Sequence, residues 1–441
     1  MNNIRDFVLK ISIFKRYIMP TAIITTPESP WTSAKVSPSN AKSSIALTGT
    51  SDQTWIGFGG CFNEIGWNEL QKLSLEDRSN VLKAFFDQEE GCKFNFCRMP
   101  IGANDYALSW YSLNESDGDY AMENFSIERD KGCLIPYIKA AQAINPNFEL
   151  FASPWSPPSW MKMPKAYNYG KLVTSEENLK AYALYFKCFV EAYASEGIKI
   201  NEVHVQNEPN SDQKFPSCVW TGAKMRDFIR DHLGPLFEKM ECSIGAGTIE
   251  RDNFDSWAMT IMNDPECRKY IASVGYQWAG KGSVQRTHQA WPDMKIIQTE
   301  NECCAGENSW QDAEYVYDLF QHYITNGVSA YTYWNMVLQP GGESTWGWHQ
   351  NAMVTVENGK AIYNPEFYVM KHHSHFIQPG AIRQVITGHW AAKSTCFKNP
   401  DGSLVYVLHN PFETCENITL FSGSELYDLE LPAHAFATVQ F

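Results

Sequence analysis

Short apolar runs alternate with longer segments of helical period between residues 55 and 377. Such runs are typical of strands that are buried on both faces, and the longer segments are typical of amphipathic helices. Eight runs can be counted, beginning near Trp55, Phe94, Phe148, Val203, Cys242, Ala272, Lys295 and Ala330. Eight strands, each followed by a helix, predict an α/β fold of the (β/α)8 TIM-barrel type.

Start and stop signals define four of the predicted helices. One begins at Ser74-Leu-Glu-Asp77, which is typical of a capping box, and should carry Leu75, Leu82, Phe85 and Phe86 inward. Another begins at Ser175, ends before Gly197 and places five residues on one face: Leu179, Tyr182, Phe186, Phe189 and Tyr193. The last two are expected from Ser309 to Gly327 and from Asn364-Pro365 to a point before Pro379.

After Gly380 the pattern changes to short alternating strands. They fall at Val405–Leu408, Ile418–Leu420 and Ala435–Phe441, with turns such as Pro400-Asp-Gly402 between them. Residues 19–54 also have the pattern of strand and turn, and could pair with the first barrel strand. We therefore divide the chain into an N-terminal extension (1–18), N-terminal strands (19–54), a barrel (55–378) and an antiparallel β-domain (379–441).

Composition narrows the range of functions. The 441 residues carry 36 Lys+Arg and 50 Asp+Glu, a net charge of −14, which argues against a nucleic-acid partner. The 12 cysteines include no CxxC pair or Cys/His knuckle, so we expect neither a disulfide scaffold nor structural zinc. The N-terminal apolar run is broken by Lys10 and fails as a secretory signal, and no stretch is long enough to span a membrane. We expect a cytoplasmic protein.

Two glutamates are placed where a barrel carries its chemistry. Val203–Asn207 leads into Glu208 at the end of the fourth strand, and Lys295–Thr299 leads into Glu300 at the end of the seventh. Reactive side chains of barrels project from these carboxyl ends of strands. A pair of carboxylates, one protonated and one ionised, suits glycoside hydrolysis. Each glutamate alone could equally be a solvated loop residue.

Several motifs, in a fixed order, resemble glycoside hydrolase family 30, a group of retaining β-glycosidases that includes the glucosylceramidases. They are Gly57-Phe-Gly-Gly60, Arg98-Met-Pro-Ile-Gly102 with Asp105, Ala152-Ser-Pro-Trp-Ser-Pro-Pro-Ser-Trp160, Gln206-Asn-Glu-Pro209, Thr299-Glu300 and Tyr333-Trp-Asn335. Asn-Glu-Pro alone is common in a wider clan of barrel glycosidases, whereas the Ala-Ser-Pro-Trp element and the order of the motifs are more specific. The resemblance implies that both chain ends build a β-sandwich.

The resemblance also implies roles for single residues. Glu208 would be the acid/base and Glu300 the nucleophile, with Asn207 holding the sugar 2-hydroxyl. Arg98, at the end of the second strand, would keep the nucleophile ionised, although an internal barrel salt bridge is an equally good reading of it. The wall of the first sugar subsite would be formed by Asp105, Trp155 and Trp334.

Three other groups offer rival chemistry. Glu302 would point the same way as Glu300 if the strand continued, which makes it an alternative nucleophile. The segment Lys371-His-His-Ser-His375 invites a metal, but its place on the last helix favours surface or packing histidines. Cys303-Cys304 are expected to be small packing residues.

One departure from the family concerns the leaving-group side. Glucosylceramidases often carry His-Trp-Tyr after the sixth strand, where this chain has Gln277-Trp278-Ala279. Trp278 and Trp346 are expected to bind substrate there, and the open side would be shaped by Phe215–Trp220 and Trp348. Such a platform suits a further sugar at least as well as a lipid.

The sequence thus predicts a glucosylceramidase-like retaining β-glycosidase that needs no cofactor and no metal, with a carbohydrate or glycoconjugate as its substrate. A β-1,6-glucanase or a β-xylosidase of the same family is an alternative. Two other classes stay open: a glycan-binding barrel without activity, which the presence of both glutamates opposes, and a metal-dependent barrel hydrolase, which the lack of strand-end histidines opposes.

Overall fold

The computed structural model describes residues 20–441, so the expected extension at residues 1–18 lies outside the described part of the chain. Eight parallel strands close into a barrel in the order β10-β11-β12-β13-β14-β5-β6-β7. This confirms the predicted barrel, and each strand begins within two residues of its expected start. The bounds are β5 Gly57–Cys61, β6 Phe96–Ile101, β7 Glu149–Pro154, β10 Glu202–His204, β11 Ser243–Ile249, β12 Ile271–Gln277, β13 Lys295–Glu300 and β14 Ala330–Asn335.

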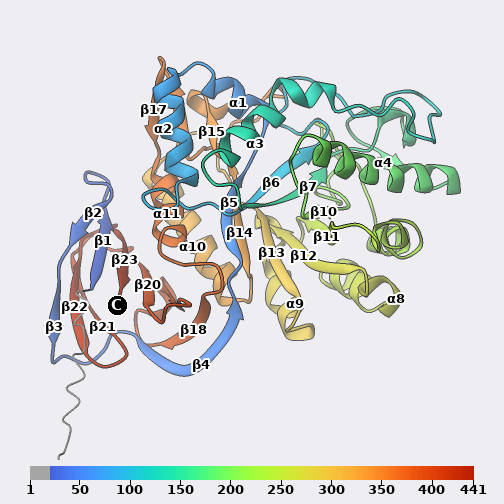
Figure 1. Cartoon of the computed structure of the whole chain (residues 1–441). Helices are drawn as coiled ribbons and strands as arrows, with labels where there is room; N and C mark the ends of the chain where they lie inside the picture. Colours follow the sequence, from blue (N-terminus) through green and yellow to red (C-terminus); the bar gives the residue numbers. More distant parts are fainter. Residues whose placement is uncertain (1–19) are drawn as a thin grey trace, which may run out of the picture.

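Helices surround the barrel on its outside (Figure 1). The main ones are α1 Glu64–Leu70, α2 Leu75–Phe86, α3 Leu134–Gln142, α4 Glu176–Ser195, α5 Gly222–Phe228, α9 Val284–Ala290, α10 Trp310–Thr325 and α11 Pro365–Ser374. Short helices α6 Gly234–Phe237, α7 Thr260–Met262 and α8 Pro265–Arg268 follow α5. A small sheet of β15 Val337–Leu338, β16 Val354–Glu357 and β17 Lys360–Tyr363 is inserted between β14 and α11, and β8 Lys162–Met163 pairs with β9 Lys171–Leu172 after β7.

The helix boundaries agree well with the capping signals. Ser74, Ser175 and Ser309 each accept a backbone N–H at the start of α2, α4 and α10. The expectation for Leu75 is wrong: it is 77% exposed, while Leu82, Phe85 and Phe86 are buried. Leu75 is the first residue of α2, and the first turn of this helix lies outside the core. The side chain of Leu75 therefore does not pack against the core, although its spacing fits the apolar stripe.

The second domain is a β-sandwich that both ends of the chain build. Its larger sheet has the order β2-β1-β23-β20-β19-β18-β4, and its smaller sheet has the order β21-β22-β3. Figure 1 shows the N-terminal strands lying among the C-terminal ones. The bounds are β1 Thr21–Thr25, β2 Thr32–Ala34, β3 Val36–Ser39, β4 Ala46–Thr54, β18 Ile382–Thr387, β19 Ser394–Lys398, β20 Leu404–His409, β21 Glu416–Phe421, β22 Leu426–Leu431 and β23 Phe436–Gln440. The N-terminal strands therefore pair with this domain and not with β5.

The sandwich is joined to the barrel through α10 and α11. Trp310 Nε1 donates to the carbonyl of His434 at 3.0 Å, and the Tyr317 hydroxyl donates to the carbonyl of Val407 at 2.9 Å. On α11, the two ring nitrogens of His372 contact the hydroxyls of Thr438 and Thr25, both at 2.9 Å. These contacts fix the sandwich against two of the outer helices of the barrel.

Candidate active site

Glu208 and Glu300 line one cavity of about 330 Å³ at the carboxyl ends of the barrel strands. Glu300 is the last residue of β13. Glu208 lies four residues beyond β10, which ends at His204 and not, as expected, at Asn207. Its backbone has φ = 44°, in the left-handed region that a residue with a Cβ rarely adopts. The chain thus turns sharply at Glu208.

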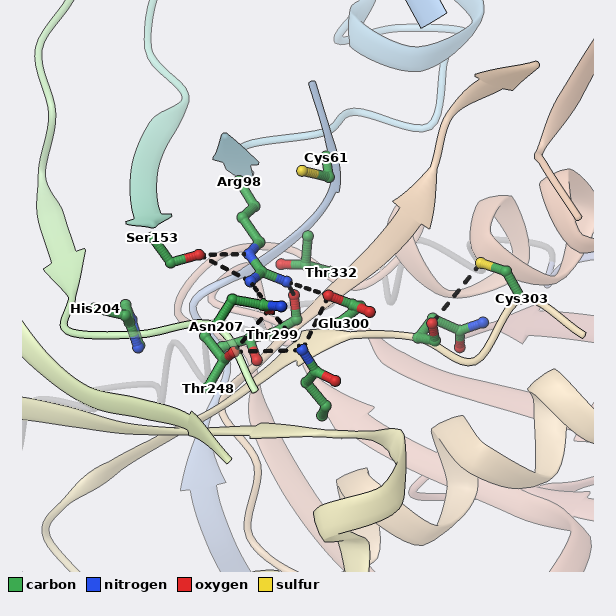
Figure 2. Close-up of polar contacts among 12 residues, drawn as sticks. Cys61, Arg98, Ser153, His204, Asn207, Thr248, Thr299, Glu300, Cys303 and Thr332 are labelled. Carbon is green, nitrogen blue, oxygen red and sulfur yellow. Dashed lines mark hydrogen bonds and ion pairs between the residues drawn. The ribbon is translucent and has the colours of Figure 1, made fainter. Parts of the chain in front are cut away.

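Arg98 organises the floor of the site (Figure 2). It lies within β6, not at its end, and its guanidinium is fully buried. Nη1 donates to Glu300 Oε2 at 2.6 Å and to the carbonyl of Thr299 at 3.1 Å. Nη2 donates to Ser153 Oγ at 2.8 Å and to Asn207 Oδ1 at 2.7 Å. One cation on β6 thereby holds the ends of three other strands, β7, β10 and β13. Arg98 thus forms an internal barrel salt bridge, and its charge opposes the rise in the pKa of Glu300.

Asn207 and Gln277 extend this network. Asn207 Oδ1 accepts from Arg98, from Gln277 Nε2 at 2.8 Å and from Thr248 Oγ1 at 3.2 Å. Gln277 Nε2 also donates to Glu300 Oε2 at 3.0 Å. Three donors point at Asn207 Oδ1, and they fix the orientation of the amide. Its NH₂ group is therefore the part of the side chain that can donate to a ligand.

The two glutamates differ in their partners. Burial raises the pKa of Glu208 to about 8, and the charges of Glu300 and Glu250 add to this rise. Burial also raises the pKa of Glu300, but the Arg98 guanidinium opposes that rise. No ion pair within residues 20–441 involves Glu208, whereas Glu300 is paired with Arg98 at 2.6 Å. The pKa of Glu300 also rises to about 8, so the two carboxyls differ in their partners: Arg98 favours the ionised form of Glu300, and Glu208 has no such partner among the described residues.

Asp105, Trp155 and Trp334 lie together, but they are not equally open to the cavity. Asp105 lines it, and burial raises its pKa to about 7. The Trp155 and Trp334 rings are almost fully buried, stack at 5.3 Å between centroids, and face the Arg98 guanidinium at 4.6 and 5.5 Å. Within residues 20–441, Asp105 Oδ1 and Trp334 Nε1 have no hydrogen-bond partner, as expected of groups that bind a polar ligand.

Aromatic rings from different loops surround the opening. Trp278 and Trp348 line the cavity, and the Trp348 ring lies 6.1 Å from that of Phe215. Trp346 is not among the lining residues, because its ring stacks on Trp110 at 6.1 Å with an interplanar angle of 9°. Trp346 thus ties the loop after β14 to the loop after β6, and Trp348 is the tryptophan of this loop that faces the cavity.

The rival groups have other partners. β13 ends at Glu300, so the strand does not continue to Glu302, which lines the cavity but accepts a hydrogen bond from Tyr315. Burial raises the pKa of both Cys303 and Cys304 and disfavours a thiolate at either position. Among residues 20–441, no group of three or more His, Cys, Asp or Glu is arranged to hold a metal ion.

The structure also places in the site residues that the sequence did not single out. Ser153, Thr248 and Gln277 hold Arg98 and Asn207, and the buried Glu250 lies beside the Glu208 turn. Gln277 had been noted only for what it replaces. Ser153 belongs to the Ala-Ser-Pro-Trp motif but was given no role there. For Thr248 and Glu250, a position at or just beyond the carboxyl end of a barrel strand was the only available signal.

Comparisons with known proteins agree with this geometry. Residues 56–377 match the model of the glycosyl hydrolase family 30 TIM-barrel domain, and residues 385–439 match that of the family 30 β-sandwich domain. The chain is 32% identical to putative glucosylceramidase 1 of Caenorhabditis elegans over 391 residues, which cover 81% of this chain and 74% of that protein.

Two solved structures are similar along almost the whole chain. The structure of SrfJ from Salmonella typhimurium has a TM-score of 0.88 at 25% identity and covers 96% of this chain and 99% of that one. The endo-β1,6-glucanase BT3312 has a TM-score of 0.85 at 26% identity and covers 96% and 98%. With the barrel, the sandwich and the paired strand-end glutamates in place, the chain belongs to glycoside hydrolase family 30.

Proposed function

We propose that this glycoside hydrolase cleaves β-linked glucosides with retention of configuration, using Glu300 as the nucleophile and Glu208 as the general acid/base. The observation that carries the proposal is the unequal pairing of the two carboxyls: Arg98 lies 2.6 Å from Glu300, and Glu208 has only like charges and Arg251 nearby. A nucleophile must be ionised and a general acid must hold a proton, and these environments favour that division.

In the first step, a Glu300 oxygen attacks the anomeric carbon while Glu208 gives its proton to the departing glycosidic oxygen. The bond to the leaving group breaks, and an ester between Glu300 and the sugar forms. In the second step, Glu208 takes a proton from water, the water oxygen attacks the anomeric carbon, and Glu300 leaves as a carboxylate. Two inversions give net retention.

The other residues orient the sugar. The NH₂ group of Asn207 is positioned to donate to the 2-hydroxyl, a bond that strengthens in the transition state. Asp105 Oδ1 and the Trp334 indole N–H have no hydrogen-bond partner among residues 20–441, and both groups suit sugar hydroxyls. A carboxylate with an indole beside it is a common arrangement for holding one sugar ring.

The leaving-group side favours a second sugar over a ceramide. The cavity opens between Trp278, Trp348 and Phe215, with Arg251 and Gln213 among its polar lining. Indole rings interspersed with polar groups suit a sugar, while a two-chain lipid needs a larger continuous apolar surface. We therefore place β-glucosyl oligosaccharides, including β-1,6-linked ones, first among the substrates, with glucosylceramide and β-xylosides as alternatives.

The experiment is a substrate panel with resolved products. It contains aryl β-glucosides and β-xylosides, β-1,6-linked gluco-oligosaccharides and glucosylceramide in detergent. The proposal predicts hydrolysis of the β-glucosides, with the β-anomer released first in proton NMR. Release of the α-anomer, or hydrolysis of β-xylosides alone, would contradict it. Glucosylceramide as the best substrate would reverse the order of leaving groups and leave the mechanism intact.

A further inference from the structure

We propose that Glu250, a third buried carboxylate, is a positioning residue that holds the turn carrying Glu208 and keeps that turn negatively charged. The inference rests on the proposed role of Glu208 as acid/base. Glu250 follows directly after β11 and is 1% exposed.

The turn it holds is strained. Glu208 has φ = 44°, a conformation that persists only where the surrounding contacts fix it. Two backbone bonds close the turn: the N–H of Ser211 donates to the carbonyl of Glu208 at 2.9 Å, and that of Trp220 donates to the carbonyl of Pro209 at 2.8 Å. Both lie within the loop itself, so neither ties it to the barrel.

Glu250 supplies most of that tie, and the Trp257 indole N–H adds one bond, to Asn210 Oδ1 at 2.9 Å. Glu250 Oε1 accepts from the backbone N–H of Asn210 at 2.9 Å and from the Ser211 hydroxyl at 3.0 Å. Its Oε2 accepts from Asn210 Nδ2 at 3.2 Å. All three donors belong to Asn210 and Ser211, the second and third residues after Glu208. The carboxylate therefore fastens the turn from one side, as a capping carboxylate fastens backbone N–H groups.

Burial raises the pKa of Glu250, and the hydrogen bonds from Asn210 and Ser211 oppose that rise and favour the ionised form. Every recorded partner of its two oxygens donates a proton, and a protonated carboxyl would need an acceptor instead. Other charged groups near Glu208 are Glu300 on β13, Asp105 after β6 and Arg251, whose Nη1 donates to the Glu250 carbonyl at 2.8 Å. Glu302 and His349 line the same cavity. Among these groups, the negative charges of Glu300 and Glu250 both raise the pKa of Glu208.

Two variants separate position from charge. Glu250→Gln keeps the size of the side chain and removes the charge, whereas Glu250→Asp keeps the charge and withdraws the carboxylate from Asn210. The readout is kcat/KM across leaving groups, because this ratio reports the first chemical step. A phenol of low pKa departs without a proton from Glu208, and an alcohol or sugar does not.

For Glu250→Asp we expect kcat/KM to fall by about 10- to 100-fold on a β-1,6-linked disaccharide and by less than about 3-fold on 2,4-dinitrophenyl β-glucoside. For Glu250→Gln we expect, in addition, that the alkaline limb of the pH profile moves to lower pH, since Glu208 loses a neighbouring negative charge. Equal losses on both substrates in Glu250→Asp, or an unmoved alkaline limb in Glu250→Gln, would overturn the inference.

Asp130→Asn is the matched control. Asp130 is also a fully buried carboxylate, but it accepts from Tyr193 at 2.6 Å and Tyr111 at 2.9 Å, away from the Glu208 turn. Any loss it causes should be the same for all leaving groups. A leaving-group effect as large as that of Glu250→Asp would show that buried carboxylates act through general packing and would contradict the inference. Failure of the proposed function would appear separately, in the Glu208 and Glu300 variants.

Discussion

At the scale of single residues, the chemistry depends on which carboxyl keeps the shared proton. Glu208 is half-buried beside two other carboxylates, and Glu300 is paired with Arg98 and accepts from Gln277. In the proposed mechanism Glu208, whose raised pKa of about 8 favours a protonated carboxyl at neutral pH, is the general acid, and Arg98 favours the ionised form of Glu300.

This assignment predicts the sign of the pH dependence. With a gentiobiose-type substrate, kcat/KM should fall as pH rises through about 8, because Glu208 loses the proton that the leaving group needs. In Glu208→Ala with 2,4-dinitrophenyl β-glucoside, the alkaline limb should be absent. The measurement is kcat/KM against pH for both proteins. An alkaline limb that persists in the variant would show that another group supplies it.

The placement of residues in the site was predictable where a motif carried them. Arg98, Asn207 and Asp105 were found through short, ordered motifs, and the structure brings all three to the site. Thr248 and Glu250 could not be found in this way. Their partners lie on neighbouring strands or loops and are defined only when the barrel closes. Trp346 was expected to bind substrate, but its stacking partner Trp110 lies on another loop and could not be predicted from the sequence.

At the scale of elements, one irregular strand pairing shapes the site. β12 and β13 pair in parallel with a register shift after Tyr276, which sets Gln277 opposite Glu300. Without this shift, Gln277, the last residue of β12, would be displaced along the strand from Glu300. Apolar runs located the strands to within two residues, but periodicity holds no signal for such a shift.

Helix α2 offers a direct test of packing at the element scale. Leu75 is 77% exposed and Leu82 is buried, although both belong to the predicted apolar stripe. Leu82→Ala should reduce the free energy of unfolding by about 2–5 kcal/mol, and Leu75→Ala by less than about 0.5 kcal/mol. Urea unfolding followed by circular dichroism measures both. Similar losses at the two positions would mean that the first turn of α2 belongs to the core.

At the scale of the whole molecule, the two ends of the chain meet in one sheet. β1 pairs with β23 along Thr21–Thr25, and β4 pairs with β18, so the sandwich forms only once both termini are in place. The pattern of short alternating strands and turns after Gly380 marked the C-terminal domain as antiparallel β-structure. That the N-terminal strands belong to the same sandwich was predicted from the family resemblance, because strand partners this far apart in sequence leave no local pattern.

The described chain also leads to a prediction about metals. Among residues 20–441 no ligand cluster is present, and the buried histidines of α11 contact Thr25, Thr438 and the carbonyl of Val369. Incubation with EDTA followed by dialysis should leave kcat on an aryl β-glucoside unchanged. A large loss that Ca²⁺ or Zn²⁺ restores would show that catalysis or folding uses a metal.

The most direct test of the account is the stereochemistry of azide rescue. In Glu208→Ala, an activated aryl β-glucoside still forms the glycosyl-enzyme on Glu300, and azide, which needs no general base, should release β-glucosyl azide. In Glu300→Ala, azide would attack the substrate from the opposite face and give the α-azide. The anomeric proton coupling in NMR distinguishes the two products. An α-azide from Glu208→Ala together with a β-azide from Glu300→Ala would reverse the two roles, and full activity in Glu300→Ala with none in Glu302→Ala would move the nucleophile to Glu302.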